Sequence, residues 1–223
     1  MSAIEHGGDN HADLMDRTYR YQRHFYDLTR RYYLLGRDRL IAELDAPEGT
    51  TVLEVGCGTG RNLVHAARLY PQALLHGMDI SDEMLATAHK TAVRHHADIR
   101  FAQGDAARFN PYAAFGVSRF DRIFMSYTLS MIPDWQKTLA QGICNLAHGG
   151  SLHIVDFGGQ ERLPRWFRAL LRAWLAKFHV SPRDELERVL RALAAKLGAE
   201  LEFRSLYGGY AWYAVLRLPA QAG

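Results

Sequence analysis

The feature that most restricts the fold of this chain is the alternation of short apolar runs with longer helical patterns in its central part. Five apolar runs are predicted to be buried strands: Thr51–Val55, Leu74–Met78, Ile99–Ala102, Arg122–Ser126 and Leu152–Asp156. Helical stretches such as Asp82–His95 and Trp135–Leu146 separate them. This alternation is typical of a parallel, doubly wound sheet, so an α/β, Rossmann-like fold is expected.

The ends of the chain depart from this alternation. The last segment, "ELEFRSLYGGYAWYAVLRL", has two alternating runs around Tyr207-Gly208-Gly209 and is predicted to be an antiparallel hairpin. Helical patterns also cover Asp13–Leu44 and Leu163–Leu197; in the second, Ser181 and Pro182 are expected to start a helix that Gly198 ends. We expect one domain: an N-terminal helical lid (1–45), a core (46–157), a helical insertion (158–198) and the hairpin (199–223).

Composition limits the class of protein. The chain has 223 residues, of which 48% are hydrophobic, and this is enough for one sizeable core. The two cysteines, Cys57 and Cys144, are far apart, so neither a disulfide framework nor a metal site is expected. No signal peptide or membrane-spanning run is apparent, which favours a cytoplasmic protein or one that rests on a membrane. A net charge of +3 does not by itself indicate nucleic acid.

A glycine-rich loop follows the first predicted strand, with the spacing Gly56-x-Gly58-x-Gly60. Glycines let the main chain turn sharply and let a ligand approach it closely. Arg61 stands where the dinucleotide fingerprint has Gly or Ala, which counts against an ordinary NAD enzyme. Asp79 ends the second strand about 20 residues further on, where a carboxylate can accept hydrogen bonds from both hydroxyls of a ribose.

The next two strand ends carry further polar groups. Asp105, after the third strand, can accept a hydrogen bond from the exocyclic amine of adenine. Ser126, Tyr127 and Thr128 lie at the end of the fourth strand, and ligands of open α/β sheets bind outside the carboxyl ends of the strands. The loop lacks the lysine of a P-loop. The predicted ligand is therefore a nucleoside without a phosphate chain.

Together these residues resemble the class I S-adenosylmethionine-dependent methyltransferases. Their loop motif, E/D-x-G-x-G-x-G, is matched here from Glu54 to Gly60, and their sheets end in a reversed hairpin strand. The resemblance implies S-adenosylmethionine as cofactor. It also implies a set of cofactor-binding residues: Glu54, Gly56, Cys57, Gly58, Gly60, Asp79, Ile80, Met84, Gly104, Asp105, Ala106 and Ser126. Cys57 is expected to fill space, since no base is identifiable near it.

The segment "LPRWFRALLRAWLAKFHV" combines an aromatic stripe with basic residues and has no acidic residue from Arg162 to Val180. Its large apolar side chains recur at helical spacing: Trp166, Phe167, Leu170, Leu171, Trp174, Leu175 and Phe178. Two interpretations remain open. The helix either packs on the core with a solvated basic back, or lies on a membrane with its arginines near anionic lipid phosphates.

The N-terminal run "YDLTRRYYLLGRDRLI" and the tyrosines and arginines before it resemble the bacterial N-methyltransferases of betaine-lipid synthesis. The resemblance implies three methylations of the amine of diacylglyceryl homoserine on the inner face of a membrane, after an aminocarboxypropyltransferase has made that lipid. Tyr26 and Tyr127 are expected to line the methyl-transfer channel, because aromatic faces accommodate a methylammonium charge. The expected substrate-binding residues are Tyr19, Arg20, Arg30, Arg31, Tyr32 and Arg37, in which an arginine pairs with the headgroup carboxylate.

Other activities fit parts of the same pattern. A phosphatidylethanolamine N-methyltransferase would share the cofactor site and the basic helix. Methylation of a quinone carbon or of nucleic acid is a less favoured alternative; the interleaved aromatic and arginine residues of the N-terminal region could stack on bases and bind phosphates. A non-catalytic membrane-binding or nucleoside-sensing module is a further alternative from a different class of protein.

Overall fold

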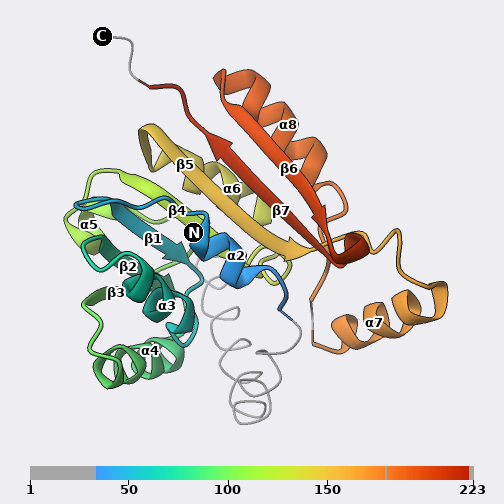
Figure 1. Ribbon diagram of the computed structural model, residues 1–223, viewed down its shortest axis with the longest axis horizontal. Helices are drawn as coiled ribbons and strands as arrows, with labels where there is room; N and C mark the ends of the chain where they lie inside the picture. The colour runs from blue at the N-terminus through green and yellow to red at the C-terminus, as the bar shows by residue number, and fades with distance from the viewer. Residues whose placement is uncertain (1–33, 179, 221–223) are drawn as a thin grey trace, which may run out of the picture.

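One seven-stranded sheet organises the chain in the computed structural model, which describes residues 34–178 and 180–220 (Figure 1). The strands lie in the order β3-β2-β1-β4-β5-β7-β6. Their bounds are β1 (Thr51–Val55), β2 (Leu74–Asp79), β3 (Ile99–Gln103), β4 (Phe120–Ser126), β5 (Leu146–Phe157), β6 (Glu200–Leu206) and β7 (Ala211–Arg217). β1 to β5 are parallel, and β7 runs antiparallel to both β5 and β6. The predicted α/β class and the C-terminal hairpin are confirmed.

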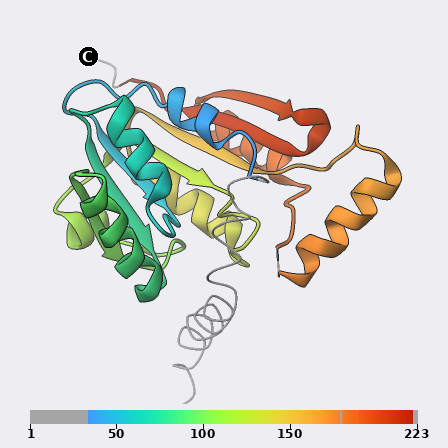
Figure 2. The ribbon, with the colours of Figure 1, turned by 60° about the horizontal axis from the view of Figure 1, so that its bottom comes forward.

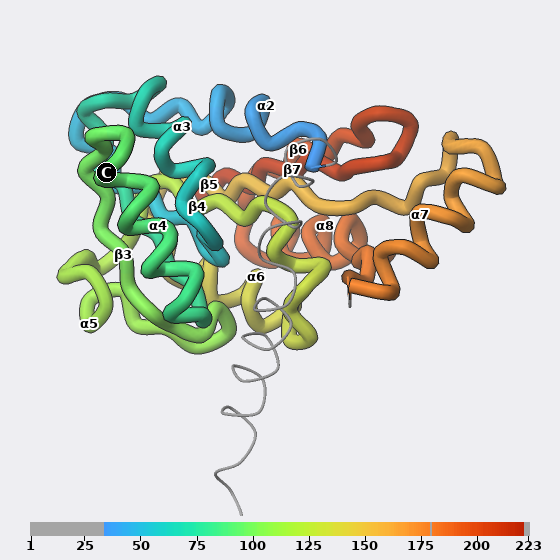
Figure 3. The backbone as a smooth tube through the Cα atoms, turned by 90° about the horizontal axis from the view of Figure 1, so that it is seen from below, coloured from blue at the N-terminus to red at the C-terminus, as the bar shows by residue number. Residues whose placement is uncertain are grey.

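Helices cover both faces of the sheet, as Figure 3 shows for α2 and α3 on one side and α6 and α8 on the other. The first face carries α2 (Arg37–Ala42), α3 (Arg61–Leu69) and α4 (Asp82–Arg94), and the second carries α5 (Pro111–Phe115), α6 (Trp135–Cys144) and α8 (Leu186–Leu197). Val52 and Leu53 of β1 point to opposite faces of the sheet, so each belongs to a different one of the two core clusters. Among the described residues, no helix is both long and apolar enough to cross a bilayer.

Tertiary contacts explain two differences between the predicted and the observed helix bounds. The helix that begins at Trp135 ends at Cys144 instead of Leu146, because Leu146 pairs with Phe120 and begins β5. The helix expected to start at Ser181 and Pro182 begins at Leu186. There the Ser181 N–H donates to the Ser130 carbonyl oxygen at 2.9 Å, so the chain before α8 is held against the loop after β4.

Local signals placed other elements correctly. The Ser81 hydroxyl accepts a hydrogen bond from the Met84 N–H at 3.4 Å and caps α4, which begins at Asp82 as predicted. Gly198 ends α8 with a φ of 61°, in the left-handed region that favours glycine. Of the predicted N-terminal helical region, only α2 lies within the described residues.

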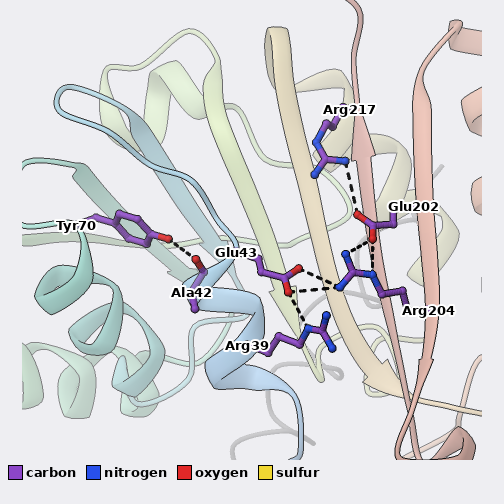
Figure 4. A network of polar contacts seen from close by, with 7 residues as sticks. All are labelled: Arg39, Ala42, Glu43, Tyr70, Glu202, Arg204 and Arg217. Atoms are coloured by element: carbon purple, nitrogen blue, oxygen red, sulfur yellow. Dashed lines mark hydrogen bonds and ion pairs between the residues drawn. The ribbon is translucent and has the colours of Figure 1, made fainter.

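A chain of ion pairs joins the end of α2 to the C-terminal hairpin (Figure 4). Glu43 pairs with Arg39 at 2.7 Å and with Arg204 of β6 at 3.4 Å. Arg204 also pairs with Glu202, which reaches Arg217 of β7 at 3.9 Å. All five side chains are partly exposed, so these pairs orient α2 on the sheet and contribute little stability each.

His153, in the middle of β5, should make stability depend on pH. Its Nε2 lies 2.9 Å from the Ser151 hydroxyl, and burial lowers its pKa from 6.5 to about 3. The folded state keeps this imidazole neutral while the unfolded chain takes up a proton below the ordinary pKa, so stability is lost as pH falls. Urea unfolding should lose about 2 kcal/mol from this residue between pH 7 and pH 5.

The His153→Gln variant should flatten this pH dependence. His148→Gln is the matched control, because His148 is an exposed histidine of the same strand. An unchanged pH dependence in His153→Gln would assign the acid sensitivity to other groups.

Candidate S-adenosylmethionine site

The glycine loop after β1 folds back over the end of β2. The N–H groups of Gly56 and Cys57 both donate to the Met78 carbonyl oxygen, at 2.8 and 2.9 Å, and the Gly60 N–H donates to the Cys57 carbonyl oxygen at 3.0 Å. Gly56, Gly58 and Gly60 have φ values of 72°, 52° and 73°. Side-chain-bearing residues rarely adopt this conformation, so the three glycines are needed for the turn that leads into α3.

Gly56 is also packed against its own chain. A Cβ atom on Gly56 would lie 2.6 Å from Cγ2 and 2.9 Å from Oγ1 of Thr128, which follows β4. The Thr128 hydroxyl donates to the Val55 carbonyl oxygen at 3.0 Å. The first glycine therefore lets the loop after β4 approach the end of β1, in addition to leaving the main chain open to a ligand.

Asp79 joins the end of β2 to the glycine loop. One carboxylate oxygen accepts the Gly58 N–H at 2.8 Å, and the other accepts the Ser81 N–H at 3.0 Å. A carboxylate has about four acceptor positions, so these two bonds are compatible with hydroxyl donors from a ligand. The predicted ribose-binding acid thus lies directly beside the loop.

Glu54 and Cys57, just before and within the loop, are both buried. Glu54 is buried and accepts a hydrogen bond from the Asn62 side-chain amide of α3 at 2.7 Å. Burial raises the pKa of the Cys57 thiol well above its usual range, and the negative charges of Asp79 and Glu54 add to this effect. A thiol held in its protonated form is a poor nucleophile, which agrees with the expected space-filling role.

The end of β3 approaches the glycine loop (Gly56–Gly60) and Asp79, which we together call the corner. The Gly104 N–H donates to the Asp79 carbonyl oxygen at 3.0 Å, and a Cβ on Gly104 would lie 2.7 Å from the Met78 sulfur. Asp105 accepts the Ala107 N–H at 2.9 Å and pairs with Arg108 at 3.0 Å. Three further predicted residues lie on these loops and on α4: Ile80 is half-buried, and Met84 and Ala106 are buried.

The end of β4 carries an unsatisfied hydroxyl. The Ser126 Oγ is buried and has no hydrogen-bond partner among the residues that the structure describes. Buried polar atoms are nearly always paired with protein, water or ligand. Ser126 is the last residue of β4, the neighbour strand of β1, so its hydroxyl is a candidate contact for a ligand in this corner.

Tyr127 has a structural contact that its sequence position did not indicate. Its hydroxyl donates to the Leu35 carbonyl oxygen at 2.6 Å. Its ring packs edge-on against the ring of Phe157, with the two ring centroids 4.7 Å apart. Burial raises its pKa well above the usual range, and Tyr210 and Asp156 contribute to the shift. The hydroxyl therefore stays protonated and fixes the segment before α2 to the end of β4.

Most of the predicted substrate-binding residues lie outside the described residues: Tyr19, Arg20, Arg30, Arg31 and Tyr32. Tyr26, predicted to line the methyl-transfer channel, also lies outside them. Arg37 is within them and is buried in the first turn of α2. Its Nε donates to the Leu34 carbonyl oxygen at 3.1 Å. Arg37 thus orients the start of its own helix.

Two buried polar residues near the end of β5 were not predicted as site residues. Asp156 accepts the N–H groups of Ser130 and Phe157, at 3.0 and 2.8 Å, and burial raises its pKa. Its place at a strand end could have indicated it. Gln160 is fully buried, and neither side-chain amide atom has a partner among the described residues. Nothing in its sequence neighbourhood indicates this burial.

Comparison with known proteins agrees with this geometry. Residues 52–150 match the family model described as a methyltransferase domain. The chain is 32% identical over 163 residues to a demethylmenaquinone methyltransferase of Deinococcus radiodurans, an alignment that covers 71% of this chain and 64% of that protein. It is 31% identical over 170 residues to a trans-aconitate 2-methyltransferase of Delftia acidovorans, covering 75% and 57%. The chain thus spans less than two thirds of the length of either relative.

Solved structures share the fold at low sequence identity. The plantazolicin methyltransferase BpumL, solved with SAH, superposes with a TM-score of 0.69 at 16% identity and covers 89% of this chain and 91% of its own. A phosphoethanolamine N-methyltransferase of Haemonchus contortus superposes with a TM-score of 0.65 at 18% identity, covering 83% and 52%. Residues 52–150 therefore match a methyltransferase domain, and the chain shares the Rossmann-like fold of solved methyltransferases.

Proposed function

We propose that this protein transfers methyl groups from S-adenosylmethionine to the amine of diacylglyceryl homoserine, three times in succession, to give the trimethylated betaine lipid. The observation that carries the methyl-transfer part is the joined corner of the glycine loop and Asp79, with the Gly58 N–H bonded to the carboxylate at 2.8 Å. The lipid acceptor rests on the resemblance of the N-terminal segment to betaine-lipid N-methyltransferases.

The residues of the corner fit the cofactor. The loop offers a main chain without Cβ atoms at Gly56, Gly58 and Gly60, and Asp79 can accept hydrogen bonds from a ribose. Half-buried Ile80 and buried Met84 offer apolar contacts for a base. When bound, S-adenosylmethionine supplies a methyl group on a positively charged sulfur, which is already a good electrophile.

The protein itself would contribute by positioning the two reactants and by excluding water from the amine. Holding two reactants in line can contribute on the order of 7–11 kcal/mol to lowering the barrier. The amine must be neutral to react, and removal from water favours its neutral form. The buried ring of Tyr127 and the predicted ring of Tyr26 would line the channel and accommodate the growing methylammonium charge.

The headgroup carboxylate needs a cationic partner. We propose that one of Arg20, Arg30, Arg31 or Arg37 supplies it, because a guanidinium binds a carboxylate through two parallel hydrogen bonds. An aminocarboxypropyltransferase would supply the lipid, and the reaction would take place at the inner face of the membrane. Tyr19 and Tyr32 would complete the wall around the headgroup.

A second candidate is methylation of a small carboxylic acid. It is favoured by the relative from Delftia acidovorans, which is a trans-aconitate 2-methyltransferase 31% identical over 170 residues. Phosphatidylethanolamine is a further acceptor to compare, because a solved neighbour is a phosphoethanolamine N-methyltransferase. The two lipid acceptors share the amine, whereas the small acid would accept the methyl on oxygen.

The test is a parallel assay of the purified chain with labelled S-adenosylmethionine and three acceptors. These are diacylglyceryl homoserine and phosphatidylethanolamine, each in mixed micelles, and trans-aconitate in solution. Mass spectrometry should find mono-, di- and trimethylated homoserine lipid and no product from the other two. Methylation of phosphatidylethanolamine or of the acid in place of the homoserine lipid would overturn the acceptor and leave methyl transfer intact. Cofactor binding without turnover of any acceptor would favour a non-catalytic module.

A further inference from the structure

We infer that one side of α7 (Arg165–Lys177) binds the surface of an anionic lipid bilayer, with Trp166 and Leu170 entering the headgroup region. Figures 1 and 2 both show α7 at the edge of the molecule, away from the corner formed by the glycine loop. The inference concerns a surface and not the reaction, so it goes beyond the proposed function and can be tested apart from it.

The core accounts for only one apolar side of α7. Leu171 and Leu175 are buried in the same cluster as Phe157 of β5 and Tyr210, which precedes β7. Three aromatic side chains are partly buried against this cluster: Phe167, Trp174 and Phe178. These contacts fix the helix to the body of the protein, as the first interpretation of the sequence requires.

A second apolar stripe of α7 faces away from the core. Trp166, Ala169, Leu170 and Ala173 are all exposed and occupy positions i, i+3, i+4 and i+7, which share one side of a helix. The large members of the stripe are unusually open, since Trp166 is 71% and Leu170 63% exposed. We call these four residues the outer stripe.

Other exposed apolar side chains of similar size do not form such a stripe. Val93 and Tyr112 are 76% and 71% exposed, but they lie singly on α4 and α5. Single exposed apolar residues are normal on protein surfaces, whereas an aligned aromatic and aliphatic pair on one helix marks an interaction surface. Val93 and Tyr112 therefore provide a matched control.

The charges around the outer stripe favour an anionic partner. Within the described residues, neither Arg165 nor Arg168 has an ion pair, and Arg172 pairs with Asp184 at 3.3 Å. The next helix is different, because in α8 Arg188 pairs with Glu185 at 2.8 Å and Arg191 with Glu187 at 2.6 Å. α7 itself contains no acidic residue.

An exposed aromatic and aliphatic stripe bordered by unneutralised arginines has the chemistry of an interfacial helix. The apolar side chains enter the boundary between headgroups and acyl chains, and the arginines meet lipid phosphates. A neutral bilayer would satisfy only the first requirement. The proposed binding partner of α7 is therefore a bilayer that contains anionic phospholipid.

The experiment is vesicle flotation of the full chain with phosphatidylcholine vesicles, with and without phosphatidylglycerol. The wild type should float with the anionic vesicles only, and less as salt is raised. The Trp166→Ser/Leu170→Ser variant should bind them on the order of tenfold or more weakly, from lost apolar burial. The Arg165→Gln/Arg168→Gln variant should bind roughly 30-fold more weakly, because each basic residue contributes about 1 kcal/mol near such a surface.

Matched variants separate the surface from general damage. Val93→Ser/Tyr112→Ser and Arg188→Gln/Arg191→Gln should float like the wild type, and every variant should bind SAH with unchanged affinity in calorimetry. Equal flotation of the α7 variants and the wild type, or no binding of wild type to anionic vesicles, would overturn the inference. So would a concentration-dependent dimer that Trp166→Ser/Leu170→Ser abolishes while vesicle binding persists, because the outer stripe would then bind a second copy.

The outcome is distinguishable from that of the proposed function. Flotation that depends on the outer stripe, together with no methylation of the homoserine lipid, would keep this inference and reject the acceptor. Methylation of that lipid in micelles by a chain that binds no vesicles would do the reverse.

Discussion

Replacing Asp79 by alanine is expected to weaken the binding of both S-adenosylmethionine and SAH by about 1.5–3 kcal/mol, or about 10- to 150-fold in Kd. Asp79 accepts hydrogen bonds from the Gly58 and Ser81 N–H groups and is placed to accept more from a ribose. Hydrogen bonds to a charged group are worth more than neutral ones, so the loss should be large. Isothermal titration calorimetry measures it directly.

A ligand variant can separate the two roles of Asp79. If the carboxylate contacts the ribose, removal of the 2′-hydroxyl from SAH should weaken binding to the wild type and change little in Asp79→Ala. Asp82→Ala, at the first position of α4, is the control for loss of a nearby negative charge. Equal sensitivity of both proteins to the missing hydroxyl would mean that Asp79 acts only by holding the loop.

The Gly56→Ala variant is expected to lose about 2–5 kcal/mol of folding stability and its affinity for the cofactor. An alanine there must adopt a φ of 72°, which costs about 1–2 kcal/mol. Its Cβ would also lie 2.6 Å from Thr128 Cγ2, and overpacking of this kind costs about 1–3 kcal/mol. Urea unfolding with and without SAH measures both losses.

A second glycine separates backbone strain from the clash. Gly49 has a φ of 77°, but a Cβ there would meet nothing within 4 Å. Gly49→Ala should therefore show the strain alone. The double variant Gly56→Ala/Thr128→Ala should be more stable than the sum of its single variants predicts, because the second change removes the clashing atoms. Additive losses would show that Thr128 moves aside without cost.

The amino-acid sequence by itself determined the elements whose signals are local. Short apolar runs predicted all five parallel strands, because a strand buried on both faces needs a nearly continuous apolar run. Ser81 and Gly198 marked helix ends, since a cap acts within one turn. The loop from Gly56 and the position of Asp79 were predictable because their spacing repeats a known motif of a known geometry.

Only the tertiary structure decided features that depend on distant residues. The hydrogen bond from the Tyr127 hydroxyl to the Leu35 carbonyl oxygen joins residues 92 positions apart, and no local pattern indicates it. α8 starts four residues later than Pro182 because Ser181 is bound to the loop after β4. The aromatic stripe of the insertion divides into one side that packs on the core and one that stays exposed. A helical period shows which residues share a side, but burial depends on which long-range neighbours the folded chain brings to that side.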